Sequence, residues 1–284
     1  MAGIANVIPG ADFSNSILGR VTKIVTPAEK AAEIVSTYTT AIGNTTFAPQ
    51  LRTLVKTLIE AGAWEGIDIY PMLGSTLTHK QVNLNPNDGL LGTPILFGEN
   101  ASNVEDGVSF VTMGSSAVGL SGIERREFPW ANKTGLFICA DMQHTGTTGT
   151  QSTLYFSRNA ANNASFRMQS SATAKQVFIE VGSTSSSTSI YTENYRFLVA
   201  ASLGADNVRM YTDGALETTK AYANPSSTAI VRVHNILGAT ENDTASTSYN
   251  GIAKFWALGY IDPSKHEAVI NAIKAFMDSV KPRS

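Results

Sequence analysis

Acidic residues gather at two places in this chain, and paired carboxylates are the groups that cleave glycosidic bonds. The first cluster is Glu124-Arg125-Arg126-Glu127 and the second is Glu241-Asn242-Asp243. A glycoside hydrolase needs two carboxyl groups about 5–9 Å apart across the bond that it breaks. Neither cluster has the Glu-x-Asp-x-(x)-Glu spacing that retaining enzymes on a β-sandwich carry on one strand. We interpret the first as a solvated, ion-paired strand edge or loop. The second is a polar loop that could also hold a cation or a sugar.

The four histidines do not form a recognisable catalytic or metal-binding pattern. No two of them have the spacing of zinc ligands, and none lies near a serine or cysteine nucleophile motif. The chain also contains no glycine-rich phosphate-binding loop. The sequence therefore predicts that the protein is not an enzyme. The histidines are His79, His144, His234 and His266.

Ligand binding has better candidates. A sugar offers an apolar CH face and many hydroxyl groups, so its sites combine an aromatic ring with Asn or Asp acceptors. Trp130, Asn242 and Tyr249 lie in polar segments and are our candidate ligand-binding residues. The alternative for Trp130 is an anchor packed on the core at the start of a strand, and Tyr249 has a similar alternative.

No organic cofactor is predicted, and a metal is predicted only as an option. Asp141, Asn242 and Asp243 are oxygen donors in or beside loops, so they could hold a calcium ion. The alternative is that all three are ordinary turn residues.

Composition excludes several classes of function. The chain has 284 residues, a formal net charge of -2 and 15% charged residues, against about 25% in average soluble proteins. Because it has no basic block, nucleic acid is not an expected partner. Cys139 is the single cysteine and lies in an apolar run, so we expect a buried thiol. Met1–Ile8 is too short for the apolar part of a secretory signal, so we expect folding in a cytoplasm.

The elements that must position these residues are mainly β-strands. Phe197, Val199 and Ala201 alternate with their neighbours, and Asp213-Gly214 favours a tight hairpin turn. Leu136–Ala140 is apolar throughout, so it should be a strand buried on both faces, and Ile252–Ile261 has apolar residues on both faces and should be a central strand. Short strands separated by turn residues from about 107 to 261 predict an antiparallel two-sheet sandwich.

Three helices lie outside this β pattern. Thr26-Pro27-Ala28-Glu29 is a capping box that opens the first helix, and Gly43 ends it. The expected apolar stripe of this helix is Ala28, Ala31, Val35, Tyr38 and Ile42. A second helix should begin at Pro49, and a third should run from Asp262-Pro263 to Val280, with no helix between them. The third should pack on the edge of the sandwich or on a neighbouring subunit, through an apolar stripe of Val269, Ile270, Ile273, Phe276 and Val280. None is long and apolar enough to insert into a membrane. The predicted division is an extended arm over 1–25, a helical segment over 26–65, and the sandwich with its C-terminal helix over 66–284.

The phrase RMYTDGALE over 209–217 resembles a hairpin of the laminin-G-like or concanavalin-type jelly rolls. Three other segments resemble structural proteins of tailed bacteriophages that carry such a domain. They are Ala11–Thr22 in the arm, Tyr70–Gly74 with Asn83-Leu84-Asn85, and Phe255–Gly259 before the last helix.

This resemblance implies a jelly-roll protein of the virion, made in the host cytoplasm. The role that it favours is adhesion at the tail or baseplate, through a host glycan or receptor. The alternatives are a capsid decoration protein, a glycan-degrading enzyme and a cellular carbohydrate-binding module. The expected partners are other virion subunits and further copies of the chain. We expect the arm to dock on another subunit through Asp12, Phe13, Leu18 and Arg20.

Overall fold

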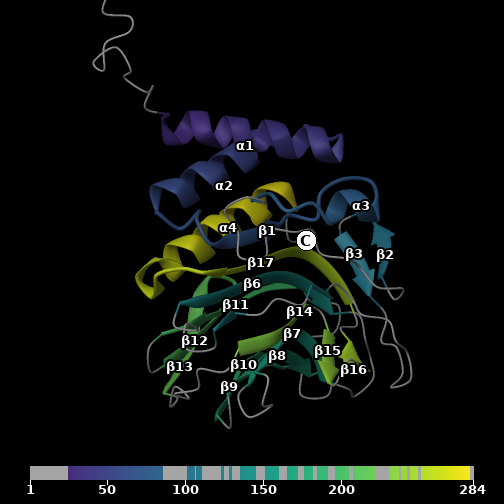
Figure 1. Ribbon diagram of the computed structural model, residues 1–284, viewed down its shortest axis with the longest axis vertical. Helices are drawn as coiled ribbons and strands as arrows, with labels where there is room; N and C mark the ends of the chain where they lie inside the picture. Colours follow the sequence, from purple (N-terminus) through teal and green to yellow (C-terminus); the bar gives the residue numbers. More distant parts are fainter. Residues whose placement is uncertain are drawn as a thin grey trace, which may run out of the picture.

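The computed structural model describes most of the helices and strands of the chain. The described residues are 25–85, 101–105, 107–110, 123–124, 128–129, 135–144, 151–159, 165–171, 176–181, 184–190, 196–204, 207–221, 230–236, 238–241, 244–248 and 251–281. They form three layers, with helices on one sheet and that sheet on a second one (Figure 1). We call the sheet that contacts the helices the inner sheet and the other the outer sheet.

The inner sheet has 8 strands in the order β13-β12-β11-β6-β17-β3-β2, with β1 also paired to β17. All of these pairs are antiparallel. Its strands are β1 (Ile67–Tyr70), β2 (Ala101–Val104), β3 (Gly107–Phe110), β6 (Leu136–His144), β11 (Arg196–Leu203), β12 (Asn207–Thr212), β13 (Ala215–Ala221) and β17 (Gly251–Tyr260).

The outer sheet has 7 strands in the order β10-β9-β8-β7-β14-β4, with β5 also paired to β14. A small hairpin, β15 (Gly238–Glu241) with β16 (Thr244–Ser248), lies against β7. The strands of the outer sheet are β4 (Ile123–Glu124), β5 (Phe128–Pro129), β7 (Gln151–Asn159), β8 (Ser165–Ser171), β9 (Gln176–Val181), β10 (Thr184–Ile190) and β14 (Ile230–Ile236). The described fold is therefore mainly an antiparallel β-sandwich, as predicted.

The Asp213-Gly214 turn confirms the local prediction most directly. Both residues have positive φ, 53° and 86°, which joins β12 to β13 without splaying the strands. The apolar runs also behave as predicted. Leu136–Ala140 of β6 is buried throughout, and β17 lies inside the sheet between β6 and β3. The alternation predicted for Phe197, Val199 and Ala201 was wrong, because every residue of β11 after Arg196 is buried. Cys139 is buried in β6.

The helices are α1 (Pro27–Ile42), α2 (Ala48–Glu60), α3 (Leu77–Lys80) and α4 (His266–Val280), with a short 3-10 turn η4 (Pro263–Lys265). The predicted capping box is present, because Thr26 and Glu29 each bond the other's backbone, and Gly43 ends α1 in the left-handed region. The described helices include none that is long and apolar enough to cross a membrane.

Three sequence-based expectations about the helices were wrong. We expected no helix inside 66–262, yet α3 lies there, capped by Thr76. We expected α4 to pack on the edge of the sandwich or on a neighbouring subunit, but it packs on the face of the inner sheet beside β6 and β11. Its predicted apolar stripe is buried, with Ile273 at 0% exposure. Ala28 was placed on the apolar stripe of α1, but it is exposed.

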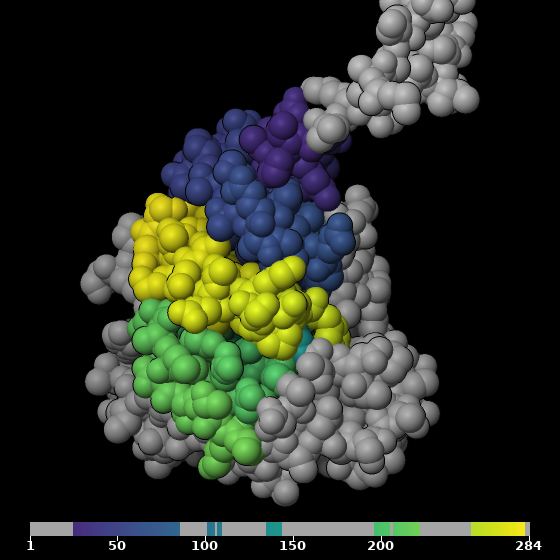
Figure 2. All heavy atoms as spheres, turned by 90° about the vertical axis from the view of Figure 1, so that its left-hand side faces the viewer, coloured from purple at the N-terminus to yellow at the C-terminus, as the bar shows by residue number. Residues whose placement is uncertain are grey.

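One apolar core joins the helices to the inner sheet. It includes Val35 of α1, Leu58 of α2, Phe137 of β6 and Ile273 of α4. In Figure 2 the purple and blue helices and the yellow α4 form a continuous block above the green β12–β13 hairpin. The helices therefore fill one face of the inner sheet, and the outer sheet lies across its other face.

Candidate functional site

The residues that the sequence singled out for ligand binding lie outside the described residues. This holds for Trp130, Asn242 and Tyr249, and also for the arm residues Asp12, Phe13, Leu18 and Arg20. Their roles stay predictions. What the structure does place is the set of strands on either side of them.

Two of these strands, β5 and β15, adjoin opposite ends of β14. Trp130 follows β5, which pairs with Ile230 and Val231 at the start of β14. Asn242 lies between β15 and β16, and β15 begins just after β14 ends at Ile236. β14 has 7 residues, and at about 3.3 Å per residue its ends are roughly 20 Å apart. β5 and β15, the strands next to Trp130 and Asn242 in the chain, therefore adjoin β14 about one strand length apart.

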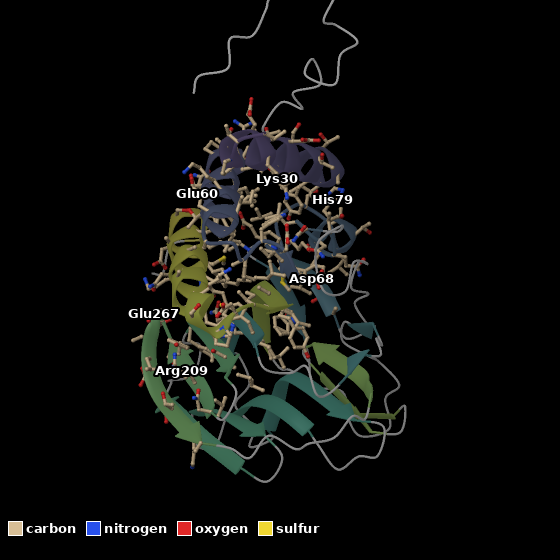
Figure 3. The ribbon with its side chains drawn as sticks, turned by 60° about the vertical axis from the view of Figure 1, so that its left-hand side comes forward. Lys30, Glu60, Asp68, His79, Arg209 and Glu267 are labelled. Atoms are coloured by element: carbon tan, nitrogen blue, oxygen red, sulfur yellow. The ribbon has the colours of Figure 1, made fainter. Side chains whose placement is uncertain are left out.

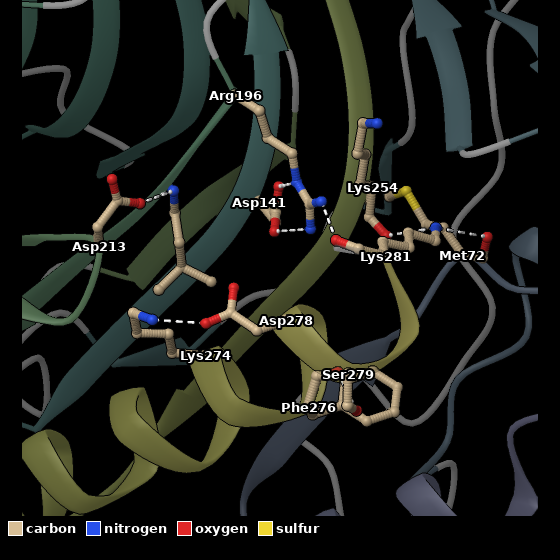
Figure 4. Close-up of polar contacts among 11 residues, drawn as sticks. Met72, Asp141, Arg196, Asp213, Lys254, Lys274, Phe276, Asp278, Ser279 and Lys281 are labelled. Carbon is tan, nitrogen blue, oxygen red and sulfur yellow. Dashed lines mark hydrogen bonds and ion pairs between the residues drawn. The ribbon is translucent and has the colours of Figure 1, made fainter. Parts of the chain in front are cut away.

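Asp141, a suggested calcium ligand, is bound in an ion pair. Its two carboxylate oxygens accept hydrogen bonds from Nε and Nη2 of Arg196, at 2.7 and 2.6 Å, and its exposed fraction is 0%. Arg196 also donates from Nη1 to the carbonyl of Lys281, just after α4 (Figure 4). Lys281 in turn donates to the carbonyl of Lys254 in β17, at 3.1 Å. The cluster therefore ties the end of α4 to the inner sheet.

Asp141 was offered as a calcium ligand or an ordinary turn residue, and the structure places it instead within strand β6, with both of its carboxylate oxygens bound to a guanidinium. Among the described residues there is no group of three or more His, Cys, Asp or Glu side chains that could hold a metal. Asn242 and Asp243 lie outside those residues, so calcium there stays a prediction.

The structure pairs a serine and a histidine that sequence reasoning did not connect. Ser202 of β11 shares a hydrogen bond with Nδ1 of His266, and Nε2 of His266 lies 2.9 Å from the carbonyl of Ile261. Because a carbonyl only accepts, Nε2 carries the proton and Nδ1 accepts from the Ser202 hydroxyl. Burial lowers the pKa of His266, although hydrogen bonds to the Ile261 and Gly135 carbonyls oppose that shift.

A histidine that accepts a serine proton is the arrangement used in nucleophilic hydrolysis. Here the exposed fractions are 1% for Ser202 and 0% for His266, so no substrate reaches the pair. The ring of His266 also lies against Phe137, with centroids 5.3 Å apart. The pair therefore anchors the start of α4 on β11 and β6.

A second buried polar network closes the edge of the inner sheet at β1. The Asn83 side chain accepts from the backbone N–H of Ile69 at 2.9 Å and donates to Asp68. The Asn85 side chain donates to the carbonyls of Trp64 and Ile67, at 2.7 and 3.0 Å. These side-chain amides form hydrogen bonds with backbone groups that another strand could otherwise bind. The Asn-Leu-Asn segment that the sequence analysis singled out is thus an edge closure.

The Lys80 side chain also binds backbone groups, at the β2–β3 turn. Its ammonium group donates to the carbonyls of Val104 and Gly107, although only 1% of the residue is exposed. Figure 3 shows Asp68 inside the molecule, between the helices and the sheet, and Arg209 and Glu267 at its surface. Among the residues whose burial the structure describes, the buried carboxylates are Asp68 and Asp141, and they are held by Asn83 and Arg196.

Comparison with known proteins gives fold similarity only. No protein-family model matches the chain, and no curated protein matches it. A Trypanosoma rangeli sialidase in complex with 2,3-difluorosialic acid has a TM-score of 0.54 at 12% identity, over 90% of this chain and 39% of that one. The same sialidase in complex with sialic acid has a TM-score of 0.51 at 13% identity, over 85% and 40%.

A carbohydrate-binding module of a Ruminococcus gnavus sialidase has a TM-score of 0.41 at 12% identity, over 58% of this chain and 97% of the module. That score is too low to support an argument. This chain spans about two fifths of the length of the sialidases that it matches. At these identities the likeness establishes a shared β-sandwich fold and nothing about residues.

The comparison overturns one prediction. We expected a protein that is not an enzyme, and that expectation was wrong, because the fold is one that sialidases use. The error came from treating the lack of a local carboxylate motif as evidence against an enzyme. The structures named above are those of sialidases and of a sialidase module.

Proposed function

We propose that this chain binds glycans on its outer sheet and on the loops at the ends of that sheet. The observation that carries the proposal is the filling of the inner sheet. Helices α1, α2 and α4 lie on the far side of the inner sheet from the outer sheet (Figures 1 and 3). The central strands of the inner sheet are buried along almost their whole length. A ligand surface on this sandwich therefore belongs to the outer sheet, one face of which no described helix covers.

The names of the structural neighbours support a glycan as the ligand. One is a sialidase in complex with sialic acid, and such proteins share this sandwich. Glycan cleavage is a second candidate function, favoured by the same fold similarity. The experiment below therefore measures binding and cleavage together.

For the biological setting we propose a jelly-roll protein of a tailed-phage virion, at the tail or baseplate. The sequence resemblance of the arm and of the Tyr70–Gly74 and Phe255–Gly259 segments supports this setting. In the structure, Tyr70 belongs to β1 and Phe255 to β17, and these two strands pair. Two of the resembling segments thus meet in one structural unit. Capsid decoration is the alternative within this setting.

The test replaces Trp130, Asn242 and Tyr249 by alanine, singly, in the phage and in the purified protein. Adsorption to host cells, particle yield and head stability are measured for the phage. Binding to host polysaccharide and release of sugar are measured for the protein. Slower adsorption by intact particles, together with weaker polysaccharide binding, is the expected result. Normal adsorption with fragile heads would favour decoration and remove the receptor role.

A further inference from the structure

His266 is the first residue of α4, and its ring joins that helix to three other parts of the fold. Ser202 of β11 shares a hydrogen bond with Nδ1, and Nε2 donates to the carbonyl of Ile261 just after β17, at 2.9 Å. The ring of Phe137 in β6 packs against it, with centroids 5.3 Å apart. The exposed fraction of His266 is 0%. This side chain therefore fastens the start of α4 to the inner sheet.

This buried place suits a neutral imidazole and not a protonated one. A neutral ring has one donor and one acceptor nitrogen, which match the Ile261 carbonyl and the Ser202 hydroxyl. After protonation both nitrogens are donors, so the Ser202 hydroxyl has to turn and give its own proton another acceptor. The new charge is also buried, and it lies at the N-terminus of α4, where the helix dipole disfavours a cation. Protonation therefore costs the closed structure free energy that it does not cost an opened one.

The groups around the ring act in both directions, and burial outweighs the others. Burial is the largest effect and lowers the pKa of His266. Hydrogen bonds to the Ile261 and Gly135 carbonyls and the charge of Asp262 raise this pKa, and the charge of Arg209 on β12 lowers it. Asp262 and Arg209 are both exposed, so solvent weakens the effect of their charges. The net direction is a lowered pKa.

The other elements packed at the start of α4 bring no buried acid to the ring. β6 and β11 contact it through Phe137 and Ser202, which carry no charge. Of the flanking residues, Lys265 donates to the carbonyl of Gly62 at 2.8 Å, and Glu267 is exposed. Helix α2 also packs on α4, and its charged residues are exposed; they are Arg52, Lys56 and Glu60. None of these groups is a buried carboxylate that could hold the protonated ring in place.

We propose that His266 is an acid-sensitive latch, which releases the start of α4 from the inner sheet when the ring takes up a proton. The other end of α4 is held differently. There Arg196 donates to the Lys281 carbonyl and to Asp141, and a guanidinium keeps its charge in acid and neutral solution alike. The release therefore begins at His266 and leaves the Lys281 end in place. The inference concerns the motion of α4 and is independent of the proposed glycan binding.

Cys139 reports this motion, because it lies in the core that α4 covers. It is buried in β6 with an exposed fraction of 0%, and its core cluster includes Ile270 and Ile273 of α4. It is also the single cysteine of the chain. A thiol reagent therefore labels Cys139 at a rate that depends on how often this core opens.

The test labels the full chain with 4,4′-dithiodipyridine, which reacts with thiols in acid as well as neutral solution, between pH 7.5 and 5. Each rate is divided by the rate for the urea-unfolded chain at the same pH, which removes the titration of the thiol itself. Uptake of one proton by a ring whose pKa is about 6.5 in the open form should raise this ratio by up to about thirtyfold over the range. His266→Gln should lose most of the increase, and the matched control His79→Gln, on α3, should keep it.

Two comparisons distinguish the latch from acid unfolding of the whole chain. Local release exposes less surface, so labelling should rise less steeply with urea than global unfolding, which the fluorescence of the buried Trp64 and Trp256 follows. An equal urea dependence, or a labelling ratio that does not change with pH, would overturn the latch. If His266→Gln does not fold, nitrogen-15 NMR of the unaltered chain decides. A pKa of the folded His266 ring below its ordinary value is expected, and a pKa at or above that value would overturn the proposal.

Discussion

Replacing Arg196 by methionine should destabilise the fold strongly, because it leaves the Asp141 carboxylate buried without a cation. Asp141 has an exposed fraction of 0%, and its two hydrogen bonds to Arg196 are 2.7 and 2.6 Å long. Removing one member of a buried pair costs about 3–5 kcal/mol, since the remaining charge keeps its desolvation penalty. The lost hydrogen bond to the Lys281 carbonyl also loosens the end of α4.

Urea unfolding followed by tryptophan fluorescence measures this change, because Trp64 and Trp256 are both buried in the described core. The double variant Arg196→Met with Asp141→Leu should recover most of the loss, since no buried charge remains. The matched control is Lys56→Met. It breaks an exposed pair of similar length, Lys56–Glu60 at 2.7 Å, and should cost less than about 1 kcal/mol. If Arg196→Met also costs less than about 1 kcal/mol, the ion pair does not hold α4 on the inner sheet.

Three further predictions concern the core, the histidine and the arm. Ile273→Ala should lower the free energy of unfolding by about 2–5 kcal/mol because Ile273 is fully buried, and an unchanged melting temperature would refute that packing. Burial lowers the pKa of His266 in the folded chain, so the unfolded chain binds this proton more readily. The free energy of unfolding should therefore be greatest above about pH 6.5 as far as His266 is concerned, and should fall as the pH drops below that value. The charged groups that act on the ring are Asp262 and Arg209, and unfolding of His266→Gln from pH 7.5 to 5 should show a shallower slope than the unaltered chain. Deletion of 1–25 should leave the melting temperature unchanged and prevent incorporation into particles, and normal incorporation would exclude the arm from assembly.

The parts of the fold that the sequence predicted are those that local chemistry determines. The β12–β13 hairpin follows from Asp213-Gly214 between alternating residues, and the capping box sets the first turn of α1. The burial of Leu136–Ala140 in β6 follows from a run without polar residues, and β17 has apolar residues on both faces, with Lys254 as its one charged residue. The four-residue helix α3 has too few residues to show an apolar period. Its one local signal is the cap at Thr76.

The polar contacts inside the fold could not be predicted, because their partners are far apart in the sequence. Asp141 and Arg196 are separated by 55 positions and Ser202 and His266 by 64. Nothing near Asp141 distinguishes a calcium ligand from the partner of a distant arginine.

Hydrogen exchange of the backbone amides, with and without a bound polysaccharide, tests the central claim most directly. The claim is that the outer sheet binds glycan while the inner sheet is filled on both faces. Peptides from 151–190 and 230–248 should gain protection when the polysaccharide that the chain binds best is added. Peptides from 196–221 and 251–281 should exchange as before. Protection confined to the inner sheet or to helices α1, α2 and α4 would contradict the account.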